Sequence, residues 1–251
     1  MTSSTRAFDA VFRSVEHVDG WMSPDQAERL FAAAARTQPG ERIVEIGSFR
    51  GRSTIVLVSA APEGVEVVAI DPHAGNDRGP QEYEGFEAEA HDDHQIFLAN
   101  LESAGVRERV RHIRSFSSDA LGDVPGSIDV LYVDGAHRFA PARADIREWG
   151  AKVGPGGTLL IHDSFSSIGV TLAILRELVP SKRWRYVGRS RSLTEYRLDL
   201  ATSSTGRAAN AAHQLAQVPW FVKNVLIKVL IAAKLGGVLQ RVTGRQPEWP
   251  Y

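Results

Sequence analysis

Residues 128–137 read IDVLYVDGAH. Five of the first six residues are apolar or aromatic, a pattern typical of a strand that is buried on both faces of a sheet. The polar residues Asp134 and His137 then follow at the point where this strand should end. In open α/β sheets, ligands bind beyond the carboxyl ends of the strands, so the position of these two residues favours a functional site over a solvated loop.

Apolar strand-like runs alternate with helix-like runs along most of the chain. The strand-like runs are ERIVEIG (41–47), VEVVAID (65–71), VRHI (110–113), IDVLYVD (128–134) and GTLLIHD (157–163). Short apolar strands followed by amphipathic helices predict a parallel sheet with helices on both faces. WRYVG (184–188) and SLTEYRLDL (192–200) have no helix between them, which predicts a closing antiparallel hairpin. The expected fold class is α/β, with a doubly wound, mostly parallel, seven-stranded sheet.

Length and composition restrict the class of protein. The 251 residues are 43% hydrophobic and 24% charged, which is sufficient for a full core without disulfides or structural metals. We expect an N-terminal helical cap (1–40), a ligand-binding domain (41–200) and a basic helical tail (201–251). A net charge of -1 gives no electrostatic case for nucleic acid, so the expected partner is a small molecule.

Cysteine content and the N-terminus bear on the cellular location. The absence of cysteine excludes a disulfide framework and thiolate chemistry. The start, MTSSTRAFDAVF, lacks the apolar core of a signal peptide, so the expected location is the cytoplasm.

The first strand is followed by a glycine-containing turn, VEIGSFRGRST (44–54). Gly47 permits a tight turn, and Gly51 lets the following helix pack close to its strand. Ser53 and Thr54 can cap that helix, whose N-terminus would face a ligand. A nucleotide-like cofactor is the expected occupant.

Acidic residues at two successive strand ends support a cofactor site over an ordinary strand-to-helix turn. Glu45 lies within the first motif, and Asp71 ends the second strand near the position at which an acid pairs with ribose hydroxyls in such folds. The G-x-G-x-x-G fingerprint of dinucleotide-binding proteins is absent, which argues against NAD.

Six motifs carry a family resemblance: VEIGSFRGRST, AIDPH, FLANLESAGV, RSFSSDAL, YVDGAH and PGGTLLIHD. With these motifs in this order, the chain resembles the class I S-adenosylmethionine-dependent methyltransferases from about Gly20 to Leu198. Within that class it resembles the small-molecule O-methyltransferases, which include macrolide-sugar enzymes and, more distantly, catechol O-methyltransferase. The resemblance implies a Rossmann-like methyltransferase fold, S-adenosylmethionine as cofactor, and a hydroxyl of a sugar, glycolipid or other small polyol as acceptor.

The resemblance also implies which residues bind the cofactor. Asp71 would hold the ribose, and the remaining positions would contact the methionine part (Glu45, Gly47, Phe49, Gly51 and Ser53) or the adenine side (Ser117 and Ser118). The two serines are equally typical of a helix N-cap leading into the segment SDAL.

The chemistry of O-methylation explains the polar strand ends. An alcohol oxygen becomes a good nucleophile when a divalent ion lowers its pKa and a base takes its proton. In related metal-dependent enzymes an acid ends this strand, a base follows three residues later, and an acidic pair ends the next strand. Asp134 and Asp163 match the metal ligands, and His137 matches the base.

His162 departs from the familiar pattern, because a carboxylate is usual at this position. Magnesium prefers oxygen ligands, so an imidazole either selects another divalent metal or leaves coordination to Asp134, Asp163 and waters. We therefore expect a site for Mg²⁺ or another divalent ion at Asp134, His162 and Asp163. The alternative is structural: His137 caps the next helix and His162-Asp163 forms a turn.

The segment that precedes the sheet includes Trp21 and Met22, just before a helix start at Ser23-Pro24. Both side chains are candidates for the wall of the acceptor pocket. Aromatic residues near a helix start are more often part of the core or of a hydrophobic staple.

The C-terminal segment is basic and apolar. No acid occurs from Arg207 to Pro247, and the apolar run 220–239 contains Lys223, Lys228 and Lys234. On a helix these lysines and Asn224 fall within an arc of about 140°. A membrane span is disfavoured, because a central lysine costs about 2.5 to 3.5 kcal/mol in the bilayer core. Packing on the core, a homodimer interface and a peripheral membrane anchor remain, and the last would favour a lipid-linked sugar as acceptor.

Two other functions compete with methyl transfer. One is an NAD-dependent oxidoreductase, which the same class of fold would allow. The other is a non-catalytic cofactor-binding scaffold that docks to membranes through its C-terminal helix.

Overall fold

The computed structural model describes residues 3–74, 87–201 and 203–233. This part of the chain contains one seven-stranded sheet with the order β3-β2-β1-β4-β5-β7-β6. The strands are β1 (Arg42–Ile46), β2 (Glu66–Ile70), β3 (Val110–Ile113), β4 (Ile128–Val133), β5 (Val153–Ile161), β6 (Trp184–Ser190) and β7 (Leu193–Leu198). Strands β1 to β5 pair in parallel, whereas β7 runs antiparallel to both β5 and β6. The predicted fold class and the closing hairpin are confirmed.

The sequence of β4 shows why the centre of the sheet forms where it does. Every residue of this strand is buried except Asp129, as expected for a strand between two parallel neighbours. Asp129 lies at the start of the strand, where its Oδ2 accepts a hydrogen bond of 2.8 Å from the backbone N–H of Arg42. The one polar residue of the run thus tethers β4 to the start of β1.

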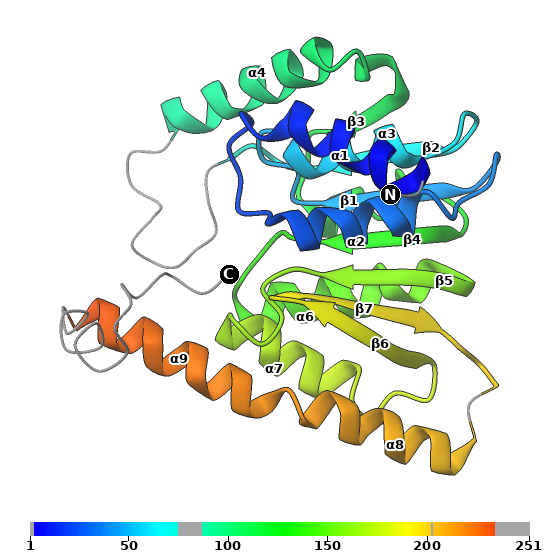
Figure 1. Cartoon of the computed structure of the whole chain (residues 1–251), viewed down its shortest axis with the longest axis vertical. Helices are drawn as coiled ribbons and strands as arrows, with labels where there is room; N and C mark the ends of the chain where they lie inside the picture. The colour runs from blue at the N-terminus through cyan, green and yellow to red at the C-terminus, as the bar shows by residue number, and fades with distance from the viewer. Residues whose placement is uncertain (1–2, 75–86, 202, 234–251) are drawn as a thin grey trace.

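Helices cover both faces of the sheet (Figure 1). One hydrophobic core joins one face of the sheet to α1 (Ser3–Val15), α2 (Pro24–Ala34), α3 (Arg52–Ala60) and α4 (Glu87–Ser103). A second core joins the other face to α5 (Ser117–Ala120), α6 (Phe139–Glu148) and α7 (Ile168–Glu177). Neighbouring residues of β1 illustrate the division, because Ile43 belongs to the first core and Val44 to the second. The chain runs outward from β1 to β3 and then returns to β4, so the strand order reverses between β1 and β4.

The tail forms two helices where the sequence pattern predicts one. Figure 1 shows α8 (Ser204–Leu215) and α9 (Val218–Ala232) following one another along the side of the molecule that carries α7. Asn210 fastens α8 to the sheet, because its side chain bonds the backbone N–H of Tyr186 and the carbonyl of Trp184. Lys234 and the rest of the predicted helix lie outside the described residues. Among the described residues, no helix is long and apolar enough to cross a membrane.

Candidate active site

A cavity of about 1280 Å³ lies beyond the carboxyl ends of β1, β2, β4 and β5. The loops after these strands form its floor, and α6 and α9 contribute to its walls. The predicted site residues that line it are Gly47, Phe49, Asp71, Ser117, Ser118, Asp134, His137, His162 and Asp163. The cavity therefore lies at the reversal of strand order, where α/β sheets bind ligands.

Gly47 allows the loop after β1 to approach the loop after β4. Its φ of 86° lies in the left-handed region, and a Cβ atom there would be 2.3 Å from the backbone oxygen of Asp134. Any other residue would push the two loops apart. Gly47 thus sets the narrow floor of the cavity.

Asp71 holds the loops after β1 and β2 together. Its Oδ2 accepts hydrogen bonds from the backbone N–H groups of Ser48 (2.9 Å) and Phe49 (2.8 Å). Its Oδ1 accepts from the backbone N–H of His73 at 2.7 Å. A carboxylate has about four acceptor sites, so Asp71, at the cavity wall, can accept a further hydroxyl donor.

Glu45, Gly51 and Ser53 do not line the cavity, unlike the arrangement that the sequence predicts around a ligand. Ser53 Oγ donates a hydrogen bond of 2.5 Å to Glu45 Oε1, and the Thr54 hydroxyl donates to the other oxygen. The first turn of α3 packs onto β1, so the Glu45 carboxyl and the two hydroxyls are buried behind the cavity wall. Burial raises the pKa of the fully enclosed Glu45 to about 8, although both hydroxyl bonds oppose this shift.

We expect Glu45 to make the protein less stable as pH rises from about 4.5 to 8. Over this range the unfolded chain releases the proton that folded Glu45 retains, which lowers the free energy of unfolding by about 1.4 kcal/mol for each pH unit. Urea unfolding at several pH values should show a flatter profile for Glu45→Gln than for wild type. Glu63→Gln, at an exposed position, should retain the wild-type slope. Equal slopes for Glu45→Gln and wild type would place the pKa of Glu45 near its ordinary value.

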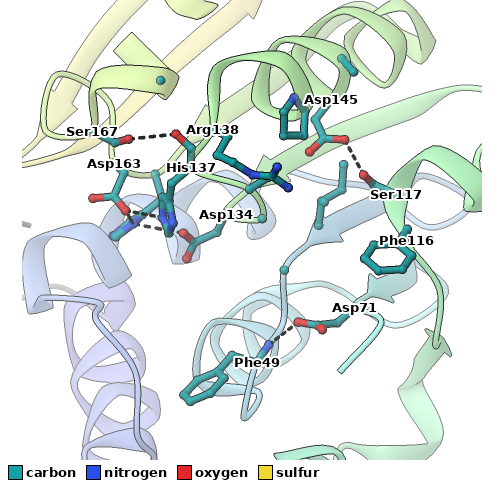
Figure 2. A pocket seen from close by; sticks show the side chains of 18 of the residues that line it. Phe49, Asp71, Phe116, Ser117, Asp134, His137, Arg138, Asp145, Asp163 and Ser167 are labelled. Atoms are coloured by element: carbon teal, nitrogen blue, oxygen red, sulfur yellow. Dashed lines mark hydrogen bonds and ion pairs between the residues drawn. The ribbon is translucent and has the colours of Figure 1, made fainter. Parts of the chain in front are cut away.

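Ser117 and Asp145 form one end of the cavity (Figure 2). Ser117 Oγ donates a hydrogen bond of 2.5 Å to Asp145 Oδ1, and Trp149 Nε1 donates to the backbone oxygen of Ser117. Burial raises the pKa of Asp145 to about 6. Phe116 lies at the same end with 58% of its surface exposed, so this end combines an open aromatic ring with enclosed polar groups.

Two histidines and two aspartates meet at the opposite end of the cavity (Figure 2). His137 Nε2 lies 2.6 Å from Asp163 Oδ2, and His162 Nδ1 lies 3.1 Å from Asp134 Oδ1. Asp163 Oδ2 is also 3.7 Å from His162 Nδ1. The ends of β4 and β5 thus bring together all four residues that the sequence predicts for the reaction centre.

The charges of this cluster are strongly coupled. Burial disfavours the imidazolium of His162, but Asp134 and Asp163 outweigh burial and raise the pKa of His162 well above its usual value. Burial would raise the pKa of Asp163, yet its contacts with the two histidines lower it well below its usual range. The pKa of His137 is raised by Asp163 against the effect of burial. The two carboxylates therefore favour the protonated form of both histidines.

The donor atoms of Asp134, His162 and Asp163 fit a divalent cation. One ligand atom from each residue lies within 4.8 Å of the other two, and no other such trio occurs among the described residues. Neither ring nitrogen of His162 makes a hydrogen bond of acceptable geometry, although the side chain is only 4% exposed. A buried imidazole without such a bond, beside two carboxylates, offers the mixed nitrogen and oxygen ligands typical of zinc, iron or manganese sites.

Comparison with known proteins relates the central part of the chain to the methyltransferases. Residues 44–164 match the family model described as a methyltransferase domain. This match covers slightly less than half of the chain. An uncharacterized protein of Sinorhizobium fredii is 31% identical over 127 residues, which span 49% of this chain and 13% of that protein.

Solved structures of methyltransferases share the fold of this chain at low sequence identity. The O-methyltransferase NovP has a TM-score of 0.59 and 16% identity over 78% of this chain and 99% of that chain. The Podospora anserina methyltransferase PaMTH1, bound to S-adenosylhomocysteine, has a TM-score of 0.56 and 15% identity over 77% and 88%. The Bacillus cereus O-methyltransferase with the same ligand has a TM-score of 0.52 and 18% identity over 79% and 92%. The predicted methyltransferase fold is confirmed.

The cavity also has lining residues that the sequence analysis missed. Asp145 appears in the sequence as one of several charged residues in an amphipathic helix, and only its contact with Ser117, 28 positions away, marks it. Val225, Lys228 and Val229 belong to α9, whose basic composition in the sequence gives no sign of a link to the site. Lys228 Nζ donates to the backbone oxygen of Ser166 at 3.0 Å, which fixes α9 beside the cavity.

Of the two candidates before the sheet, only Trp21 reaches the cavity. Its ring centroid lies 5.3 Å from that of Phe49, on the loop after β1. Met22 is 7% exposed and belongs to the hydrophobic core.

Proposed function

We propose that this chain transfers a methyl group from S-adenosylmethionine to a hydroxyl oxygen, with assistance from a divalent metal ion. The observation that carries this proposal is the single cavity that connects Asp71 and Ser117 to the cluster of Asp134, His137 and Asp163. The family match and the fold shared with cofactor-bound methyltransferases support it. We propose a saccharide, glycolipid or other small polyol as the acceptor, which the resemblance to macrolide-sugar enzymes supports.

The geometry supports an orientation for the cofactor. Asp71 would accept hydrogen bonds from the ribose hydroxyls while it continues to hold the loop at Phe49. The adenine ring would lie at the end formed by Phe116 and Ser117, where an aromatic face and polar groups are available. The reactive methyl would then point toward Asp134. Glu45 and Ser53 would act on the methionine part only through the loop in front of them.

The residues around Asp134 supply a base and a means of stabilising charge. A metal ion held by Asp134, His162 and Asp163 would lower the pKa of the acceptor hydroxyl and orient its oxygen. In the transfer, the carbon–sulfur bond of the sulfonium would break, a carbon–oxygen bond would form, and the hydroxyl proton would pass to His137. If His137 donates its Nε2–H to Asp163, its free lone pair lies on Nδ1, and Asp163 stabilises the imidazolium that results.

Labelled cofactor tests this function directly. The protein should transfer a labelled methyl group to a hydroxyl in mixtures of saccharides and glycolipids, with added manganese or magnesium, and a chelator should reduce the transfer. Product that forms equally well in the presence of chelator would refute the metal role. Cofactor binding without turnover on any acceptor would favour the scaffold, and turnover of NADH would favour the oxidoreductase.

A further inference from the structure

Helix α9 exposes a group of apolar side chains on one side and turns two polar side chains, Asn224 and Lys228, toward the body. The outer face of α9 consists of Val222, Leu226 and Val229, which are 48%, 57% and 57% exposed. Spacings of four and three residues place them on one side of the helix. A helix that only packs on a protein core shows the reverse arrangement. The outer face is therefore not the side that attaches α9 to the rest of the protein.

Polar contacts from the opposite side fasten α9 to the body. Asn224 is 2% exposed, and its Nδ2 donates a hydrogen bond of 3.1 Å to the backbone oxygen of Phe165. Lys228 Nζ lies 3.0 Å from the backbone oxygen of Ser166 and 3.1 Å from its hydroxyl. These contacts orient α9 by bonds to the loop after β5, so its outer face is fixed in direction.

The outer face of α9 adjoins the cavity. Val229 belongs to both, and Val225 and Lys228 line the cavity one turn or less away. Ser166, the partner of Lys228, is also a cavity-lining residue. Whatever covers the outer face of α9 therefore lies beside the region where an acceptor would enter.

The charge of this region favours an anionic partner. The described residues 203–233 contain Arg207, Lys223 and Lys228 and no acidic residue. A contact between the outer faces of two copies would offer the exposed Lys223 no carboxylate from this segment. An anionic lipid surface instead complements the exposed Lys223 and accepts the apolar side chains of the outer face.

We propose that the outer face of α9 docks on an anionic membrane surface and holds the cavity against the lipid headgroups. Leu226 and its neighbours on this face enter the boundary between headgroups and acyl chains, while Lys223 pairs with anionic headgroups. The acceptor is then a hydroxyl on a lipid-borne molecule that reaches the cavity past Val229. This second statement rests on the proposed methyl transfer, whereas the docking does not.

Sedimentation of the full chain with vesicles tests the docking. Wild-type protein should bind phosphatidylcholine vesicles that contain phosphatidylglycerol, bind pure phosphatidylcholine weakly, and lose binding as salt is raised. Leu226→Glu should lower the partition coefficient about tenfold or more, since burial of a leucine side chain is replaced by a charge that anionic lipid repels. Leu200→Glu, at a 65% exposed position outside α9, is the matched control and should bind as wild type does.

Three results would overturn the docking: no binding of wild type to anionic vesicles at low salt, equal loss in both variants, or a wild-type dimer that Leu226→Glu dissociates without any binding to vesicles. The last would assign the outer face of α9 to a second copy of the chain. Titration with S-adenosylhomocysteine separates this proposal from the proposed function, because Leu226 does not line the cavity and Leu226→Glu should retain wild-type affinity. Vesicle binding without cofactor binding would support docking and refute the methyltransferase activity.

Discussion

His137→Ala should lower the rate of methyl transfer by about 10² to 10⁴, and no concentration of metal ion should restore it. The reason is the position of His137 at the cavity, 2.6 Å from Asp163, where it can take the acceptor proton and share the resulting charge. Single-turnover rates with saturating cofactor measure this loss. His17→Ala replaces an exposed histidine outside the cavity and should leave the rate unchanged. A His137→Ala protein with normal turnover would exclude the base.

The carboxylates of the same cluster should respond differently. Asp134→Asn and Asp163→Asn weaken a cation site, so excess manganese or magnesium should restore part of their lost activity. Asp163→Asn should recover less than Asp134→Asn, because Asp163 also contacts His137. Asp123→Asn, at an exposed position away from the cavity, serves as the control. Full activity of the wild-type protein in the presence of chelator would exclude a metal-binding role for Asp134 and Asp163 and would leave them only an electrostatic role.

Asp71→Ala should lower the affinity for S-adenosylhomocysteine by about 10- to 150-fold, the equivalent of one charge-assisted hydrogen bond worth 1.5 to 3 kcal/mol. The affinity should also fall for a second reason. In Asp71→Ala the backbone N–H groups of Ser48 and Phe49 lose their acceptor, so the loop that forms the cavity wall is released. Calorimetric titration measures the affinity, and cooperative thermal unfolding shows that the variant is folded.

The conservative variant Asp71→Asn separates these two causes of lower affinity. Asp71→Asn retains one oxygen that can accept from the loop but loses the charge, so its affinity should lie between those of wild type and Asp71→Ala. Unchanged affinity in Asp71→Ala would remove Asp71 from the cofactor site.

The architecture follows from sequence patterns that depend on few long-range details. Strand β4 can be recognised in the sequence because a buried parallel strand must be apolar at nearly every position. The single polar residue of β4 lies at the start of the strand. The place of the cavity follows because parallel strands end on the same side of the sheet. Asp134, His137 and Asp163 meet for that reason alone, since each follows the end of β4 or β5.

Other features depend on orientations that a linear pattern does not contain. Glu45 ends up enclosed with Ser53 because α3 packs close to β1, and the motif alone does not say which side of the loop faces the ligand. A helical projection of α9 gives its polar arc but not the side that meets the body, and the structure turns Asn224 and Lys228 inward. Asp145 is recognisable only through its contact with Ser117.

Calorimetric titration of the wild-type protein with S-adenosylhomocysteine and, separately, with NADH tests most directly whether this cavity belongs to a methyltransferase. The loops that Asp71 and Gly47 hold in place predict saturable, one-site binding of S-adenosylhomocysteine. The absence of a dinucleotide fingerprint predicts that NADH does not bind. Saturable binding of NADH, or a folded wild-type protein that does not bind S-adenosylhomocysteine, would contradict the proposed function.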